Sequence, residues 1–235
     1  MRILALDSSA RMGSVALQED DDLLVDAAVE MERKHSERLL STIDWAMDTV
    51  GWRGDPVDVV AVSHGPGPFT AIRVGVTLAK TLAYGWGAEV VSFSTMDAIA
   101  HGYRYHARPL HILFDARKQQ VFSARYVPSD GGGALRRQGD IACCSIDVAV
   151  SDARPDTLCV GNGAHAYRDA ILAAGAAAQD IADVPADIAH AGALAALARE
   201  ATSSSDHVPV DPHSLAPTYI RRPEAIVRAE GAAGR

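Results

Sequence analysis

The sequence predicts an α/β protein made of two units, each built on a mixed β-sheet. Three β-rich runs separated by turns open the chain, at Ile3–Leu6, Ser14–Leu17 and Leu23–Val29, which is typical of an antiparallel meander. Helical and strand-like segments then alternate, and this order indicates parallel strands joined by right-handed crossovers. A second strand–turn–strand pattern, at Ile112–Tyr126, opens the second unit.

The elements of the first unit follow from hydrophobic periodicity and from end signals. Apolar residues recur at helical spacing in HSERLLSTIDWAMDTVG, which begins at His35, and Gly51 supplies a stop. The short apolar run Val57–Val62 predicts a buried strand. Three further elements complete the unit: a helix at Thr70–Gly85, a strand at Glu89–Phe93 and a helix that begins near Ser94.

The second unit is shorter and has weaker signals. Its opening pattern resembles Ile3–Leu17, which is explained either by an internal duplication or by the general form of any β-hairpin. A glycine loop at Gly131–Gly133 follows, then a strand at Thr157–Val160, then an alanine-rich and mostly helical stretch broken near Pro185.

These signals place the unit boundaries. We expect a first unit at residues 1–104 and a smaller one at residues 105–222, whose alanine-rich C-terminal helix can pack back on the first unit. Residues 223–235 are expected to be disordered.

Composition excludes several classes of protein. With 48% hydrophobic and 22% charged residues among 235, the chain is ordinary globular material. No uncharged apolar run reaches the ~18 residues of a membrane span, and the apolar run in MRILALDSS is shorter than the core of a signal peptide. The net charge of −8 argues against independent RNA binding, because phosphate contacts normally need a basic face. Neither a disulfide framework nor a zinc spacing is formed by Cys143, Cys144 and Cys159, which favours a reducing cytoplasm.

Two turns carry residues that suit phosphate binding. Asp7, Ser8 and Ser9 follow the first strand, where they form either a phosphate-binding turn or an ordinary hairpin in which the aspartate caps its own backbone. Gly65 and Gly67 permit close backbone approach, but the intervening prolines remove N–H donors and no lysine follows as in a P-loop. We therefore interpret the second turn as a rigid joint between strand and helix.

The helix at Thr70–Gly85 is apolar on most sides, and its only charges are Arg73 and Lys80. Its small residues Ala71, Gly75 and Ala79 recur at every fourth position and form a ridge that another helix can approach closely. A helix of this kind is buried on most sides. It is covered either by the chain's own helices, such as Glu37–Val50, or by another subunit.

Signals for catalytic chemistry are weak. His35 stands at a helix start with no second histidine one turn away, which favours a structural or capping role over a metal site. No G-x-S-x-G motif is present, and no cysteine has a base nearby in the sequence.

Several blocks together resemble the TsaB family. They are ILALDSS, HSERLL, GPGPFTAIRVGVTLAKTLAYGWG, STMDAIA, FDARKQQVF, GNGA and PTYIRR, and the resemblance runs from Met1 to about Arg222. Members of this family are small non-catalytic subunits of the bacterial machinery that makes N6-threonylcarbamoyladenosine on tRNA. The sequence departs from the usual pattern at Pro68, where serine is common, and at Ala71, where glycine is common.

The resemblance implies an actin-like ATPase (ribonuclease H-like) fold with a reduced second unit. It also implies a missing catalytic metal, because Thr95 and Ile99 occupy the places of the two histidines in the HAxxH-like motif of the catalytic paralogue TsaD. We therefore expect no catalytic residue, no metal and no cofactor of the chain's own. The resemblance further implies a vestigial phosphate loop, formed by Asp7, Ser8, Ser9, Gly65 and Gly67.

The implied function is that of a partner and activator of TsaD, acting by helix-to-helix packing. Further implied partners are a TsaE-like ATPase and, for the chain alone, a second copy, with tRNA bound only through the complex. The expected interface comprises Arg38, Leu39, Thr42, Ile43, Ala71, Arg73, Val74, Gly75, Leu78, Ala79 and Lys80, with the three cations as peripheral ionic contacts.

Two enzyme hypotheses remain as alternatives. The first is an autonomous actin-like ATPase or small-molecule kinase, with ATP and magnesium held near Asp7, Ser8, Ser9 and Asp115. The segment Gly161–Gly163 is the one candidate for an adenine-binding glycine pair. The second is a metallopeptidase, against which the missing histidine pair argues.

Overall fold

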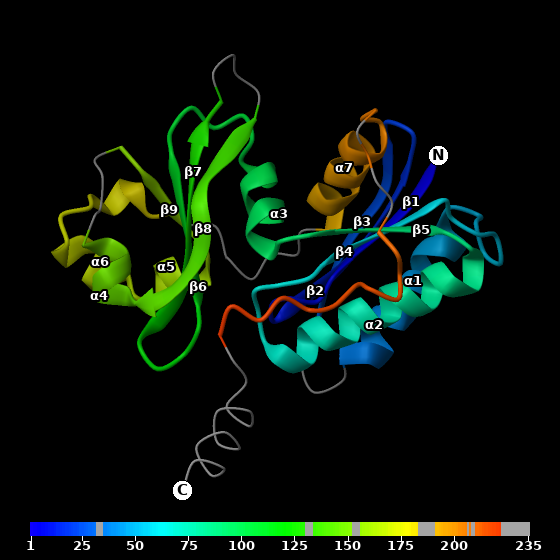
Figure 1. The fold of residues 1–235 in the computed structure, drawn as a ribbon, viewed down its shortest axis with the longest axis horizontal. Helices are drawn as coiled ribbons and strands as arrows, with labels where there is room; N and C mark the ends of the chain where they lie inside the picture. The colour runs from blue at the N-terminus through cyan, green and yellow to red at the C-terminus, as the bar shows by residue number, and fades with distance from the viewer. Residues whose placement is uncertain are drawn as a thin grey trace, which may run out of the picture.

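The computed structural model describes residues 1–31, 35–129, 134–151, 156–182, 191–205, 207 and 210–221, with only the backbone for residues 35 and 36. The chain forms two sheets that lie side by side, with helix α3 (Thr95–Gly102) between them (Figure 1). The expected disorder of residues 223–235, the glycine loop at Gly131–Gly133 and the break near Pro185 all lie outside the described residues. Within the described ranges, no helix is long and apolar enough to cross a membrane.

The first sheet has the strand order β3-β2-β1-β4-β5. Its strands are β1 (Arg2–Asp7), β2 (Met12–Glu19), β3 (Asp22–Glu30), β4 (Val59–Ser63) and β5 (Glu89–Phe93). The first three form an antiparallel meander, while β4 and β5 run parallel to β1, so that Ala5 lies opposite both Ala16 and Ala61. The predicted meander followed by crossovers is confirmed.

The second sheet repeats this pattern with one strand fewer, in the order β8-β7-β6-β9. Its strands are β6 (Leu110–Asp115), β7 (Gln120–Pro128), β8 (Leu135–Ser145) and β9 (Leu158–Val160). The hairpin β6–β7 and the parallel pair β6–β9 match β1–β2 and β1–β4. A repeat of strand order and direction is what an internal duplication produces, and the predicted reduced second unit is confirmed.

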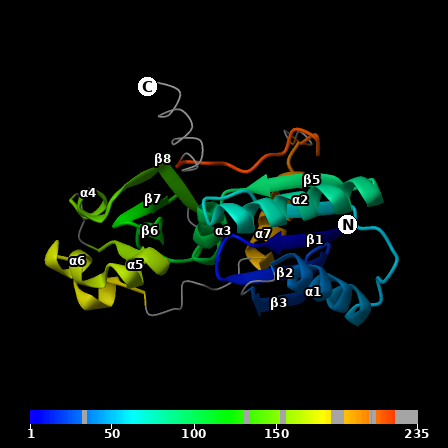
Figure 2. The same ribbon diagram turned by 90° about the horizontal axis from the view of Figure 1, so that it is seen from below.

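Alternating side chains of the first sheet build a core on each of its faces. Leu4 and Leu6 point toward α1 (His35–Thr49) and α2 (Phe69–Trp86), whereas Ile3 and Ala5 point toward α7 (Ala191–Thr202). This period of two is intrinsic to a strand and explains why its run is apolar throughout. Figures 1 and 2 show the resulting three layers.

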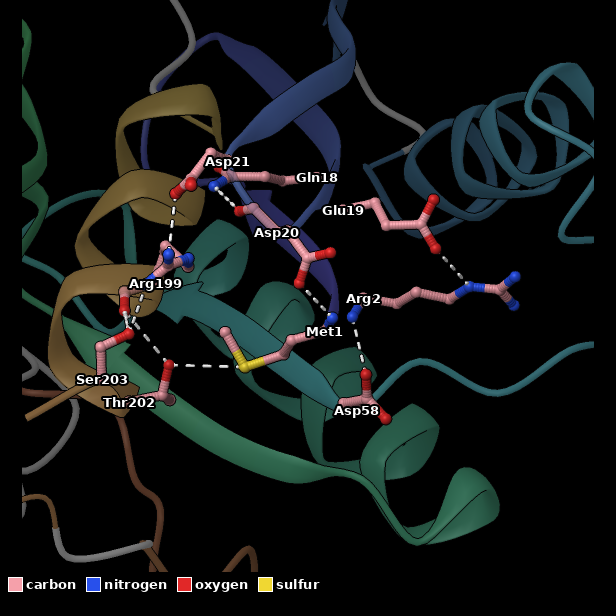
Figure 3. Close-up of polar contacts among 10 residues, drawn as sticks. All are labelled: Met1, Arg2, Gln18, Glu19, Asp20, Asp21, Asp58, Arg199, Thr202 and Ser203. Carbon is pink, nitrogen blue, oxygen red and sulfur yellow. Dashed lines mark hydrogen bonds and ion pairs between the residues drawn. The ribbon is translucent and has the colours of Figure 1, made fainter.

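Helix α7 joins the first unit although it follows the second in the sequence. Arg199 donates to Asp21 at 2.8 Å, and the Thr202 hydroxyl lies 3.6 Å from the Met1 sulfur (Figure 3). At the other end of the helix, the Ala191 amide donates to Ser14 Oγ at 2.9 Å. The chain therefore leaves the first unit after α3 and re-enters it with the alanine-rich helix.

The second sheet is covered on its outer side by α4 (Ile146–Val150), α5 (Asn162–Ala166), α6 (Arg168–Ala173) and a short 3-10 turn (Ala178–Asp180). Its inner side packs on α3 through Ile112 and Phe114. A polar cluster reinforces this junction, since Asp97 accepts from the Tyr126 hydroxyl at 2.7 Å and from Arg137 at 3.0 Å. Burial, together with Asp97, raises the pKa of Tyr126, so the phenol stays a hydrogen-bond donor.

Candidate functional site: the outer face of helices α1 and α2

The small-residue ridge of α2 faces the chain's own sheet. Ala71, Gly75 and Ala79 are buried, as are Leu39 and Ile43 of α1. These residues belong to the internal packing of the first unit. The expectation that they contact a partner is therefore wrong, because small side chains that permit close approach of another helix equally permit close approach of α2 to its sheet.

Gly75 shows how close this approach is. A β-carbon built at Gly75 would lie 2.3 Å from Ser8 Oγ, which itself donates to the carbonyl of Ala71 at 2.7 Å. Val62, in the neighbouring strand β4, would lie 3.8 Å from the same β-carbon. Glycine at this position thus sets the spacing between α2 and the ends of β1 and β4.

The opposite face of α2 is exposed and forms a shallow groove with α1. The groove has a volume of about 430 Å³ and is lined by Leu40, Thr70, Arg73, Val74, Thr77, Leu78 and Thr81. Leu40 leaves 51% of its surface exposed, while Val74 and Leu78 are half-buried. An exposed leucine beside two half-buried aliphatic side chains is an apolar surface of the kind that partner proteins cover. We call these seven residues the α1–α2 face.

The C-terminal segment 210–221 runs along α2 (Figures 1 and 2). It accepts hydrogen bonds from both charged side chains of that helix. Arg73 donates to the Tyr219 hydroxyl at 2.7 Å, and Lys80 donates to the carbonyls of His213 and Leu215 at 3.2 and 3.0 Å. The side chain of Leu215 is buried in the core of the first unit. Arg73 and Lys80, expected as peripheral ionic contacts with a partner, thus also hold the chain's own C-terminal segment, and their contact with a partner stays a prediction.

The predicted residues of α1 also make contacts within the chain. Arg38 donates to the carbonyl of Glu30 at 2.7 Å, which ties the start of α1 to the end of β3. Thr42 is half-buried and returns a hydrogen bond to the carbonyl of Arg38 at 2.8 Å. Of the expected interface, Arg73, Val74 and Leu78 therefore line the α1–α2 face.

The turn at Asp7, Ser8 and Ser9 is buried under the chain's own backbone. Asp7 Oδ1 accepts from the Ser9 amide at 2.8 Å and from the Ser63 hydroxyl. Gly67 lies directly over it, because a β-carbon there would be 2.4 Å from the carbonyl oxygen of Ser9. This is the self-capped hairpin that was one of the two interpretations of the turn.

Gly65 and Gly67 belong to the same joint. The peptide between Gly65 and Pro66 is cis, and the Gly65 carbonyl accepts from the Thr95 amide at 2.8 Å. Gly65 has a φ of +111°, and a β-carbon there would lie 3.0 Å from the carbonyl oxygen of Thr218. Both glycines thus serve close backbone packing, in agreement with the interpretation of a rigid joint.

Thr95 and Ile99, the two positions that correspond to histidines in the motif of the catalytic paralogue, both hold buried side chains. Thr95 is fully buried, and Ile99 is 3% exposed and packs against the second sheet. Among the described residues, no group of three or more His, Cys, Asp or Glu side chains is arranged to hold a metal ion. His101, on the same helix, is buried with its Nε2 atom 4.0 Å from a Glu200 carboxylate oxygen, and burial lowers its pKa.

Sequence reasoning missed four residues of the α1–α2 face, namely Leu40, Thr70, Thr77 and Thr81. A signal for the last three is present. Thr70, Arg73, Val74, Thr77, Leu78 and Thr81 recur at intervals of three and four residues, which places them on one side of a helix. Threonine is neither as small as glycine and alanine nor strongly apolar, so this stripe does not stand out as an interface in the sequence.

Comparison with known proteins assigns the family. The family model described as TsaD, tRNA N6-adenosine threonylcarbamoyltransferase, matches residues 29–227. The tRNA threonylcarbamoyladenosine biosynthesis protein TsaB of Bacillus subtilis is 29% identical over 131 residues, which cover 56% of this chain and 57% of that protein. The chain therefore aligns with little more than half the length of this relative.

Two further comparisons extend over more of the chain. The TsaB protein of Haemophilus influenzae is 32% identical over 178 residues, covering 71% of this chain and 74% of that protein. The solved structure of YeaZ from Pseudomonas aeruginosa superposes with a TM-score of 0.78 at 23% identity, covering 93% of this chain and 100% of that one. The superposition confirms the predicted two-unit fold, and this chain belongs to the TsaB family.

Proposed function

We propose that this chain is the non-catalytic partner and activator of a TsaD-like transferase that forms N6-threonylcarbamoyladenosine. The modified position would be adenosine 37 of tRNAs that read ANN codons. The chain would act by presenting its α1–α2 face to helices of the transferase, so that the two proteins pack helix against helix. Relatives named for threonylcarbamoyladenosine biosynthesis support the pathway.

The observation that carries this proposal is the α1–α2 face itself. Leu40 is half exposed beside Val74 and Leu78, and exposed threonines of α2 surround them. Because about half of the Leu40 surface is already buried, covering the rest gains roughly 1 kcal/mol, so covering this face by a partner is favourable. Because short threonine side chains flank it, a second helix can approach closely.

The proposal that the chain lacks the transferase activity rests on the side chains of α3 at the two positions of the expected histidine pair, Thr95 and Ile99. Thr95 is fully buried, and Ile99 contributes to the core between the units. An isoleucine side chain cannot ligate a metal, and the buried Thr95 lies within packed structure. The metal chemistry would then belong to the partner that carries the histidine pair.

The remaining parts of the proposal follow from charge and from the relatives. A chain with a net charge of −8 would meet tRNA only through its complex, whose other subunits supply the basic surface. A TsaE-like ATPase would join the same assembly, and the α1–α2 face would pair two copies when the chain is alone. All of this would take place in the cytoplasm.

A matched set of variants tests the proposed face. Leu40→Glu and Thr77→Glu place carboxylates in the groove while leaving the core untouched, since both residues are exposed. Val148→Glu, on helix α4 of the second unit, makes the same kind of change at an apolar residue that is 61% exposed. We expect the first two variants to lose co-purification with the TsaD paralogue of the same organism, and Val148→Glu to keep it. Retention of the complex by both Leu40→Glu and Thr77→Glu would refute the assignment of the α1–α2 face as the interface.

A further inference from the structure

A cavity of about 480 Å³ lies where the two units and the C-terminal segment meet. Its walls come from the start of α2, the turn between β6 and β7, and the end of the described C-terminal segment (Figure 1). The volume lies within the range of ~300–1,000 Å³ that is common for small-molecule sites. The cavity is separate from the α1–α2 face, with which it shares no lining residue.

One part of the cavity is apolar. Phe69 of α2 and Phe122 of β7 line it, together with Pro68. The Phe69 ring is held in place by the Tyr219 ring, whose centroid is 5.2 Å away, and Phe122 is 8% exposed. Two fixed rings from different units therefore offer a surface for an aromatic or apolar group.

The other part of the cavity is basic, although the chain as a whole carries −8. Arg117, Lys118 and Arg221 line it, against the single carboxylate of Asp115. That carboxylate already accepts hydrogen bonds from the Arg117 amide at 2.8 Å and the Tyr167 hydroxyl at 3.2 Å, and its Oδ2 atom lies 3.9 Å from Nε of the largely exposed Arg117 side chain. The excess of cations favours a ligand with more than one negative charge.

The turn between β6 and β7, which carries Arg117 and Lys118, also has an unusual backbone. Arg117 and Lys118 have φ angles of +66° and +56°, and Gln119 follows at +58°. Residues other than glycine are disfavoured in this left-handed region, so the turn keeps long cationic side chains where glycine or asparagine would be less strained. Arg221 fixes the turn to the C-terminal segment by donating to the Ala116 carbonyl at 2.9 Å.

From these observations we infer that the cavity binds a phosphate monoester whose organic part is aromatic or apolar. The rings of Phe69 and Phe122 contact the organic part, and Arg117 and Lys118 contact the phosphate. The inference is independent of the proposed function, because the site lies within one chain and does not use the α1–α2 face.

Isothermal titration calorimetry on the isolated chain tests this site with three probes: phenyl phosphate, inorganic phosphate and phenol. We expect phenyl phosphate to bind at least about ten-fold more tightly than either fragment, because it alone uses both parts of the cavity. Phenyl phosphate binding that is no tighter than that of inorganic phosphate would overturn the inference.

A pair of double variants tests whether phenyl phosphate binds at Arg117 and Lys118. The double variant Arg117→Asn, Lys118→Asn removes two cations from exposed positions, and asparagine tolerates their left-handed backbone. The control double variant Arg53→Asn, Arg136→Asn removes two exposed cations that do not line the cavity. We expect about ten-fold weaker phenyl phosphate binding in the first variant alone, with unchanged circular dichroism in both. Equal affinity of the two double variants would contradict the inference.

Discussion

Gly75 of α2 lies directly against Ser8 at the end of β1, where a β-carbon would come within 2.3 Å of the serine hydroxyl oxygen. That hydroxyl is itself engaged, because it donates to the Ala71 carbonyl one turn earlier on the same helix. The ridge of small residues is thus the contact between α2 and the first sheet. The partner binding that we propose would therefore use the opposite side of the helix, at the α1–α2 face.

Replacing Gly75 by alanine is expected to destabilise the isolated chain. The added methyl group forces Ser8 or the helix to move, at a cost of ~1–3 kcal/mol in unfolding free energy. The matched control is Gly85→Ala, in the last turn of the same helix, where nothing lies within 4 Å of the new β-carbon. That control is expected to leave stability unchanged or to raise it by up to ~1 kcal/mol. Urea denaturation measures the unfolding free energy of both variants. A Gly75→Ala protein as stable as the wild type would show that α2 does not lie this close to Ser8.

Tyr219 is expected to hold the C-terminal segment on α2. Its hydroxyl accepts from Arg73, its ring lies 5.5 Å from the Arg73 guanidinium carbon, and it packs on Phe69. Contacts of this kind contribute ~0.5–1.5 kcal/mol each, so Tyr219→Ala should raise local opening about ten-fold. Hydrogen exchange at the Thr218 amide, which donates to the His64 carbonyl at 2.8 Å, reports that opening.

Tyr105→Ala serves as the control for this experiment, because Tyr105 is 80% exposed. It should leave exchange at Thr218 unchanged. If exchange at Thr218 is equally slow in the wild type and in Tyr219→Ala, other contacts hold the segment.

His101 is expected to make the protein less stable in mild acid. Burial lowers its pKa, although Glu200 of α7 acts in the opposite direction, and the nearby Arg104 lowers it further. The unfolded chain, in which histidine titrates near ~6.5, therefore binds the proton more tightly, so protonation favours unfolding. The contribution of neutral His101 is present above this value and is lost as the pH falls toward the folded-state pKa.

The variant His101→Leu removes that titration, and its melting temperature should fall less than that of the wild type between about pH 7 and pH 5. His213→Leu, at an exposed histidine of the C-terminal segment, controls for the loss of a histidine as such. An identical fall in the wild type and in His101→Leu would exclude His101 as the cause.

The sequence predicted most of the elements because their signals are local. The strand predicted at Glu89–Phe93 is β5 with the same bounds, and the predicted helix Thr70–Gly85 is α2 to within one residue at each end. By contrast, β8 is an edge strand with many exposed side chains, so its polar sequence LRRQGDIACCS carries no alternation to recognise.

The orientation of α2 could not be predicted from the sequence. The stripe of Ala71, Gly75 and Ala79 and the stripe of Thr70, Val74 and Thr77 both permit close packing. Which stripe meets the sheet depends on the Ser8 hydroxyl and on the C-terminal segment, and both are distant in the sequence. The partners of Arg73 and Lys80 were missed for the same reason.

Light scattering after size exclusion, on this chain mixed with the TsaD paralogue of the same organism, tests whether the α1–α2 face binds a TsaD-like partner. We expect a one-to-one complex that forms with the wild type and is lost in both Leu40→Glu and Thr77→Glu. We also expect this complex to replace any pairing of the chain with itself, since both would use the α1–α2 face. Separate elution of the two wild-type proteins under every nucleotide condition would contradict the proposed function.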